Sequence, residues 1–181
     1  MRVIAGRAKG RRLTVARGST TRPMMDRAKE GIFSSLGDAV VDAAVVDLYA
    51  GSGSLGLEAL SRGAESCVFV ERDRRALTAL RRNVEAVGLG GEVVSAPVED
   101  YLERPVGPFG LAFVDPPYGL PLPSVEQVLA RLARALATDA IVVVHRRVGD
   151  GEATLPGGLV ESDRRRYGQA EITRLVKEVA G

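Results

Sequence analysis

The stretch that decides the fold is Asp47-Leu48-Tyr49-Ala50-Gly51-Ser52-Gly53-Ser54-Leu55-Gly56. The apolar run over residues 44–48 has the length and β preference of a buried strand, and a helix is expected from about Leu55 to Arg62. A strand, a glycine-rich turn and a helix in this order let a nucleotide approach the backbone at the helix amino terminus. The spacing Gly51-x-Gly53-x-x-Gly56 also matches the dinucleotide-binding fingerprint. The pattern predicts a nucleotide-binding α/β unit rather than a merely structural loop.

The elements on either side of this stretch predict a mostly parallel sheet. A second apolar strand, residues 66–70, runs into Glu71, an acid placed to hold ribose hydroxyls. Further strands are expected at 92–95, 111–114 and 140–144, with helices at 26–36 and 73–87 and a helical pattern from Val125 to Leu136. Residues 159–166 and 169–176 are expected to form a final antiparallel pair. Alternating strands and helices indicate a seven-stranded α/β sheet with helices on both faces.

A second motif, Asp115-Pro116-Pro117-Tyr118, follows the apolar run 111–114. Two prolines continue neither a strand ladder nor a helix, so Asp115 is expected at the carboxyl edge of the sheet, where ligands bind. Its carboxylate and the Pro116 carbonyl can both accept from an NH₂ group. The Tyr118 ring offers a stacking surface worth about 1–3 kcal/mol per base. This chemistry suits alkylation of an exocyclic aromatic amine, and the alternative is an ordinary strand-to-turn exit.

Charge is unevenly distributed along the chain. Residues 1–30 hold nine Lys/Arg and two acids, a net +7, whereas the remainder carries −5. Two short strand-like runs, 2–5 and 11–15, surround a turn at 8–10 and predict a basic N-terminal β-hairpin arm. We therefore expect residues 1–22 to form an arm that binds nucleic acid, set apart from a domain over residues 23–181. A solvated basic tail is the alternative. The predicted phosphate contacts are Arg2, Arg7, Lys9, Arg11, Arg12 and Arg22.

Length and composition indicate the number of domains, the location and whether a metal site is expected. The 181 residues suit one domain, and no segment approaches the roughly 20 apolar residues of a membrane span. The amino terminus lacks an apolar secretory stretch, and the single cysteine, Cys67, forms no internal disulfide, so a cytoplasmic location is expected. His145 is the only histidine, which disfavours a typical zinc site, and no metal is predicted. We expect His145 to be a rim residue that could touch substrate.

With the glycine stretch and the Asp115–Tyr118 motif together, the chain resembles class I S-adenosylmethionine-dependent methyltransferases. More narrowly, it resembles the bacterial 16S ribosomal RNA guanine-N2-methyltransferases of the RsmD type, and the segments 4–13 and 22–30 are similar to that family as well. The resemblance implies a Rossmann-like methyltransferase fold and methyl transfer from S-adenosylmethionine to a guanine N2 amino group. The implied partner is 16S rRNA, within a 30S subunit or an assembly intermediate, and the implied state is a monomer.

The same resemblance implies roles for individual residues. The cofactor-binding residues would be Asp47, Tyr49, Gly51, Gly53, Glu71, Val98 and Asp115, and the catalytic residues would be Asp115, Pro116 and Tyr118. The chain departs from the family pattern at three positions: Pro97 replaces a polar residue, Met24 replaces a threonine, and His145 stands where an acid is common.

Four other functions remain open from the sequence alone. The nearest is an adenine-N6 methyltransferase acting on RNA or DNA, since the same tetrapeptide serves either amine. A glutamine-N5 protein methyltransferase more often has Asn where Asp115 stands. An NAD-dependent oxidoreductase would need a catalytic acid that the sequence does not supply. A noncatalytic RNA-binding protein would not need an intact Asp-Pro-Pro-Tyr motif.

Overall fold

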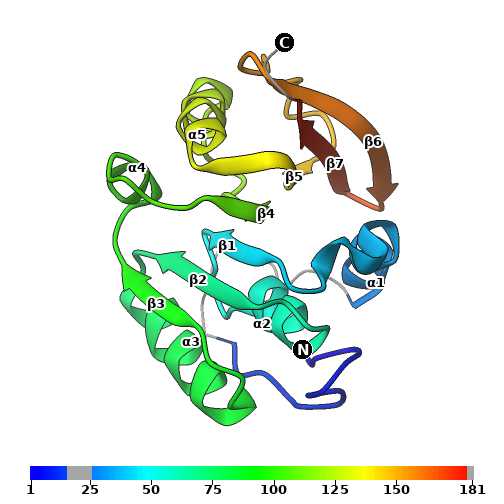
Figure 1. Cartoon of the computed structure of the whole chain (residues 1–181), viewed down its shortest axis with the longest axis vertical. Coiled ribbons are helices and arrows are strands. Elements are labelled where there is room, and N and C mark those ends of the chain that lie inside the picture. The colour runs from blue at the N-terminus through cyan, green and yellow to red at the C-terminus, as the bar shows by residue number, and fades with distance from the viewer. Residues whose placement is uncertain (16–25, 179–181) are drawn as a thin grey trace.

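The computed structural model describes residues 1–15 and 26–178, and it contains a single seven-stranded sheet in the order β3-β2-β1-β4-β5-β7-β6 (Figure 1). Strands β1 to β5 run parallel to one another, and β7 runs antiparallel to both β5 and β6. The predicted fold class, including the antiparallel last pair, is confirmed. The strand bounds are β1 Ala44–Leu48, β2 Ser66–Glu71, β3 Glu92–Ser95, β4 Phe109–Val114, β5 Leu136–Arg147, β6 Leu159–Tyr167 and β7 Ala170–Lys177.

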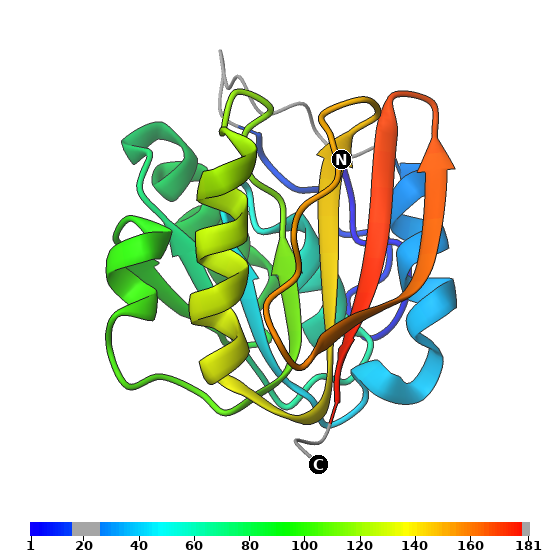
Figure 2. The ribbon, with the colours of Figure 1, turned by 90° about the horizontal axis from the view of Figure 1, so that it is seen from above.

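Helices cover both faces of the sheet, so the central strands are buried on both sides and their sequences are mostly apolar. One core cluster joins α1, α2 and α3 to side chains such as Val45 and Phe113, and the other joins α4 and α5 to Val46 and Val114. Helices α1 and α5 accordingly lie on opposite sides of the sheet (Figure 2). The helix bounds are α1 Asp26–Leu36, the 3₁₀ helix η1 Gly37–Val40, α2 Ser54–Ser61, α3 Arg74–Val87, α4 Val98–Leu102 and α5 Leu122–Arg134.

Local sequence accounts for the best-defined helix, α3. The Asp73 side chain accepts hydrogen bonds from the backbone N–H groups of Arg75 and Ala76, which caps the helix amino terminus. The helix ends at Gly88, whose φ of 69° is readily reached by glycine. Its apolar residues line one face and pack on the sheet, as their spacing predicts.

The fifth strand differs from the sequence prediction. Leu136 fits the helical spacing of α5, but α5 ends at Arg134 and Leu136 is the first residue of β5. Leu136 pairs with Phe109 of β4, and an irregularity in the ladder between Phe109 and Leu111 takes up the change in register. The contact is long-range, so the local pattern could not indicate it.

The predicted N-terminal hairpin is not confirmed as a pair of strands. Residues 1–15 contain one isolated antiparallel bridge, between Arg2 and Arg12, with flanking hydrogen bonds such as Val3 N–H to the Arg11 carbonyl at 2.9 Å. The reason is that the backbone N–H groups of Ile4 and Ala5 donate to Glu58 of α2 instead of to a second strand. We call residues 1–15 the docked arm. The predicted boundary at 22/23 and the predicted contact Arg22 lie outside the described residues.

The described residues hold neither a membrane-spanning helix nor a cluster of metal ligands. None of the helices in residues 1–15 and 26–178 is long and apolar enough to span a membrane. Within the same residues, no three His, Cys, Asp or Glu side chains gather in a way that could hold a metal ion.

Candidate active site

The candidate site lies where β1 and β4 meet, because the strand order reverses there. In open α/β sheets such a switch point leaves a crevice at the carboxyl ends of the strands. Leu48, the last residue of β1, pairs with Val114, the last residue of β4. The Asp115 N–H lies 3.4 Å from the Leu48 carbonyl oxygen. This register brings the glycine turn after β1 and the Asp115–Tyr118 motif after β4 side by side.

The backbone of the glycine turn requires its glycines at two positions for different reasons. Gly53 has φ of 80°, and its N–H closes the turn on the Ala50 carbonyl at 2.7 Å. A Cβ on Gly56 would lie 2.4 Å from Phe69 Cε1, so helix α2 can pack against β2 only without a side chain there. The turn is therefore shaped by conformation at Gly53 and by close packing at Gly56.

Asp47 is a structural anchor of the turn. Its side chain is buried, and its Oδ2 accepts the Gly56 N–H at 2.9 Å, which fastens the first turn of α2 to the end of β1. Burial raises the pKa of Asp47 well above its usual range, and the nearby carboxylates of Asp115 and Glu71 raise it further. Three acids thus stand at the ends of neighbouring strands.

Glu71, predicted to bind ribose, already holds the turn in place. Its Oε2 accepts the Gly51 N–H at 2.8 Å, and its Oε1 accepts the N–H groups of Arg72 and Asp73 at 2.7 and 2.8 Å. A carboxylate has about four acceptor positions, so one remains for a ligand hydroxyl. The sequence indicated an acid at this edge but not that it braces Gly51.

Tyr49 and Val98 connect the turn to α4. Tyr49 has a positive φ of 62°, uncommon for a residue with a side chain, and its hydroxyl donates to Glu99 Oε1 at 3.3 Å. Burial raises the pKa of the Tyr49 hydroxyl above its ordinary value. Val98, at the start of α4, is 3% exposed and packs in the core. Any ligand contact made by Val98 must therefore use its backbone.

The Asp115–Tyr118 motif contacts His145 of β5, a partner that the sequence did not reveal. Asp115 Oδ1 lies 2.6 Å from His145 Nδ1, and the rings of His145 and Tyr118 meet edge to face with centroids 5.8 Å apart. The Asp115 side chain keeps 29% of its surface exposed, whereas His145 and Pro116 are buried. The contact depends on the pairing of Val114 with Val144, which a local sequence pattern does not show.

The docked arm carries the predicted phosphate contacts on the surface. Arg2, Arg7, Lys9, Arg11 and Arg12 are all exposed. The Arg2 carbonyl accepts from the buried Lys29 Nζ at 2.6 Å, and that ammonium also donates to Ser54 beside the glycine turn. At the opposite end of α2, the Arg7 N–H donates to the Ser61 carbonyl at 2.7 Å. Arg2 and its bridge partner Arg12 thus lie toward the turn, and Arg7 lies at the far end of α2.

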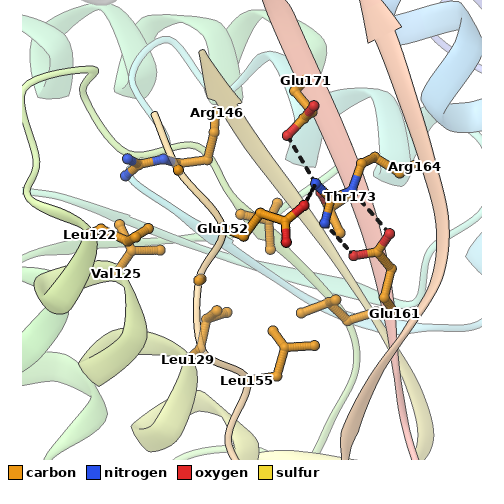
Figure 3. Close-up of a pocket in the computed structure, with 14 residues that line it drawn as sticks. Leu122, Val125, Leu129, Arg146, Glu152, Leu155, Glu161, Arg164, Glu171 and Thr173 are labelled. Carbon is orange, nitrogen blue, oxygen red and sulfur yellow. Dashed lines mark hydrogen bonds and ion pairs between the residues drawn. The ribbon is translucent and has the colours of Figure 1, made fainter. Parts of the chain in front are cut away.

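A separate cavity of about 140 Å³ opens between α5, strands β5 to β7 and the loop 149–158 (Figure 3). Its walls include Leu129, Leu155 and Leu175, and Arg164 forms ion pairs along one side with Glu152, Glu161 and Glu171. Val144 and Leu175 place this cavity on the α5 face of the sheet. None of the predicted site residues lines it, so it is not part of the candidate site.

Comparison with known proteins identifies the family. A family model described as "Conserved hypothetical protein 95" matches residues 1–176. Ribosomal RNA small subunit methyltransferase D of Escherichia coli (strain K12) is 33% identical over 184 residues, which cover 100% of this chain and 92% of that protein. The chain belongs to this methyltransferase D family. The resemblance seen in the motifs is therefore confirmed.

Two further relatives agree with this family. "Putative rRNA methyltransferase YlbH" of Bacillus subtilis (strain 168) is 37% identical over 177 residues, covering 93% of this chain and 94% of that protein. The solved structure "Putative methyltransferase yhhF from Escherichia coli" has 34% identity and a TM-score of 0.87, and the match covers 98% of both chains. The fold of the methyltransferase D family therefore extends over nearly the whole chain.

Proposed function

We propose that this chain transfers a methyl group from S-adenosylmethionine to the exocyclic N2 amino group of a guanine in 16S rRNA, within a 30S subunit or an assembly intermediate. The observation that carries the proposal is the position of Asp115 at the β1–β4 switch point, where its backbone N–H contacts the carbonyl of Leu48, the last residue of β1 before the glycine turn. Membership in a family of ribosomal RNA methyltransferases supports the substrate class. The proposal places the enzyme in the cytoplasm as a monomer.

The residues at the turn fit a nucleotide-like cofactor. A Cβ built on Gly51 would meet nothing closer than 3.9 Å, so the turn presents bare backbone to open space. Glu71 retains acceptor capacity for ribose hydroxyls. Asp47, Tyr49 and Gly53 form the rest of the proposed cofactor-binding site, with the backbone of Val98 beside it. When bound, S-adenosylmethionine supplies an electrophilic methyl group on a sulfonium.

The Asp115–Tyr118 motif orients the amine. The Asp115 carboxylate and the Pro116 carbonyl accept the two N–H groups of the base, so the nitrogen lone pair is the remaining free direction. Tyr118 stacks on the base, which must leave its helix or loop to reach the pocket. Catalysis comes from positioning and from exclusion of water, and Asp115 stabilises the positive charge that develops on nitrogen before the proton leaves.

The first experiment is labelled-methyl transfer to 16S rRNA and to 30S particles that lack this modification, followed by nucleoside digestion. We expect N2-methylguanosine. Asp115→Ala should abolish transfer while leaving the affinity for S-adenosylmethionine largely unchanged, and Asp100→Ala, at an exposed carboxylate on α4, serves as the control. Detection of N6-methyladenosine would refute the guanine assignment, and transfer by Asp115→Ala at the wild-type rate would refute the mechanism.

We further propose that residues 1–22 bind RNA phosphates and that residues 23–181 form the catalytic domain. The phosphate contacts are Arg2, Arg7, Lys9, Arg11, Arg12 and Arg22. Neutralising the five basic side chains of the docked arm should weaken RNA binding and lower the slope of log K against log salt by about 0.7 for each phosphate that is no longer neutralised. Since Arg2 and Arg12 lie toward the turn, their double variant should impair methylation more than the Arg7/Lys9 pair. Unchanged affinity and salt slope in the five-residue variant would contradict this role.

A further inference from the structure

His145 stands in direct contact with the proposed catalytic carboxylate, although the sequence suggested only a rim residue. Its Nδ1 lies 2.6 Å from Asp115 Oδ1, and its side chain is 5% exposed. The other ring nitrogen, Nε2, is buried and has no hydrogen-bond partner among the described residues. A leucine would fill similar space without burying an unpaired polar atom. The buried imidazole therefore has a role other than filling space.

The short contact bears on which ring nitrogen carries the proton. An ionised carboxylate oxygen only accepts hydrogen bonds, so an ionised Asp115 pairs with the tautomer of His145 that carries its proton on Nδ1. The contact is charge-assisted and occupies Oδ1 of Asp115. A carboxylate held on one oxygen in this way cannot rotate freely, and it presents Oδ2 as its available acceptor. The Asp115 side chain is 29% exposed, which leaves part of the carboxylate within reach of a ligand.

We propose that His145 is a positioning residue for methyl transfer: its Nδ1–H holds Asp115 Oδ1 so that Oδ2 faces the target amine. This inference rests on the function proposed above and deepens it. The rings of Tyr118 and His145 also pack edge to face, so the same imidazole supports the side chain on which the base stacks. His145 thus fixes two of the groups that orient the substrate without touching the reacting atoms.

The arrangement argues against a proton relay through His145. As the new N–CH₃ bond forms and the S–CH₃ bond breaks, the amine becomes positively charged and must lose one proton. Asp115 Oδ2 can receive it and release it to solvent through its exposed surface. His145 Nδ1 already carries a proton and cannot accept another, and Nε2 lies on the side of the ring away from Asp115. His145 therefore acts by orientation.

The test compares three substitutions in single-turnover methyl transfer to 30S particles. His145→Leu should lower the rate constant by about 10²-fold, the scale expected for a misplaced catalytic group, with the dissociation constant for S-adenosylmethionine unchanged within about threefold. The Asn amide nitrogen is as many bonds from Cβ as Nδ1, so His145→Asn should recover the rate to within about tenfold of wild type. The Gln amide corresponds to Nε2, and His145→Gln should remain as slow as the Leu variant. Thermal unfolding of each variant identifies any that is not folded.

The outcomes separate this inference from the proposed function. A wild-type rate in His145→Leu would overturn the inference, as would an Asn variant that is folded but as slow as Leu. ¹⁵N NMR of the imidazole is independent of activity: we expect the proton on Nδ1, and finding it on Nε2 alone would overturn the inference. If the wild-type enzyme methylates no RNA, the proposed function fails, and the NMR result then decides whether His145 holds Asp115.

Discussion

Glu58 on α2 offers the most demanding test of how the docked arm is held. Its side chain is 0% exposed and forms an ion pair with Lys29, also 0% exposed, at 3.2 Å. The same carboxylate accepts the N–H groups of Ile4 and Ala5 at 2.7 and 3.0 Å, and the Arg62 Nε–H at 2.8 Å. We consider Glu58→Gln, which keeps the size of the side chain and removes its charge. The change leaves the Lys29 ammonium buried without its counter-ion.

Breaking a buried pair by removing one partner costs about 3–5 kcal/mol, because the remaining charge stays desolvated. Lys29 still donates to the Arg2 carbonyl and to Ser54, which places the expected loss near the lower end, about 3 kcal/mol. Domains of this size are stable by about 5–15 kcal/mol, so the loss is a large fraction of the total. Urea unfolding at pH 7 measures it, and hydrogen exchange at the Ile4 and Ala5 amides reports whether the arm is released.

The free energy of unfolding lost in Glu58→Gln should depend on pH in a definite direction. Burial lowers the pKa of Lys29 below its ordinary value of 10.5, and Glu58 opposes that shift, so Glu58→Gln lowers the pKa further. A cationic group with a depressed folded-state pKa destabilises the fold below its unfolded pKa and has no such effect above it. The difference between variant and wild type should therefore be largest near pH 7 and shrink as pH rises toward 10.5.

Two controls make the result decisive. Glu85→Gln changes an exposed carboxylate on α3 and should alter stability by no more than about 0.5 kcal/mol. Adding Lys29→Met to Glu58→Gln removes the stranded ammonium and should recover part of the loss, which a double-mutant cycle quantifies. A loss below about 1 kcal/mol in Glu58→Gln, or a loss that does not shrink at high pH, would refute the reasoning.

Two further predictions concern the glycine turn. Gly56→Ala places a Cβ against Phe69 and should lower the free energy of unfolding in urea by about 1–3 kcal/mol. The control Gly110→Ala, whose Cβ meets nothing within 4 Å, should lower it clearly less. Equal losses in the two variants would contradict the packing argument. Burial raises the pKa of Asp47, so the contribution of this carboxyl to stability should fall as pH rises from about 3.8 through the raised value. Asp47→Asn, which keeps an acceptor for Gly56, should therefore gain on wild type as pH rises through that range. A constant difference between the two proteins over that range would show that Asp47 does not titrate as described.

The sequence predicted the parts of the site that follow directly from local patterns. Continuous apolar runs mark strands buried on both faces, and an acid or glycine just after such a run must lie at the carboxyl edge. This logic placed Glu71 and Asp115 at that edge, where the structure has them, whereas Asp47 lies within β1 and was indicated only by the family resemblance. It could not place Leu136, whose spacing fits a helix, because pairing with Phe109 of β4 decides its conformation.

Contacts between distant segments account for what the sequence did not show. The pair of Asp115 with His145 depends on the register of β4 and β5, and nothing near either residue encodes it. Glu58 likewise has the local pattern of an ordinary helical glutamate, yet its partners Ile4 and Ala5 are 54 and 53 residues away. A buried charge is identified only once its partners are known, so the sequence suggested a basic arm without the side chains that hold it.

One side chain joins the docked arm to the glycine turn. Asn83, buried on α3, accepts the Thr14 N–H at 2.8 Å and donates through Nδ2 to the Thr14 carbonyl at 2.9 Å and to the Ser52 carbonyl at 2.8 Å. The single Nδ2 group serves both segments, so the turn cannot shift relative to Asn83 without lengthening or breaking a hydrogen bond that also positions the arm. Lys29 makes a second such link, between the Arg2 carbonyl and Ser54. Asn83 and Lys29 therefore link the surface proposed to bind phosphates to the turn proposed to bind the methyl donor, and the geometry of the two is coupled.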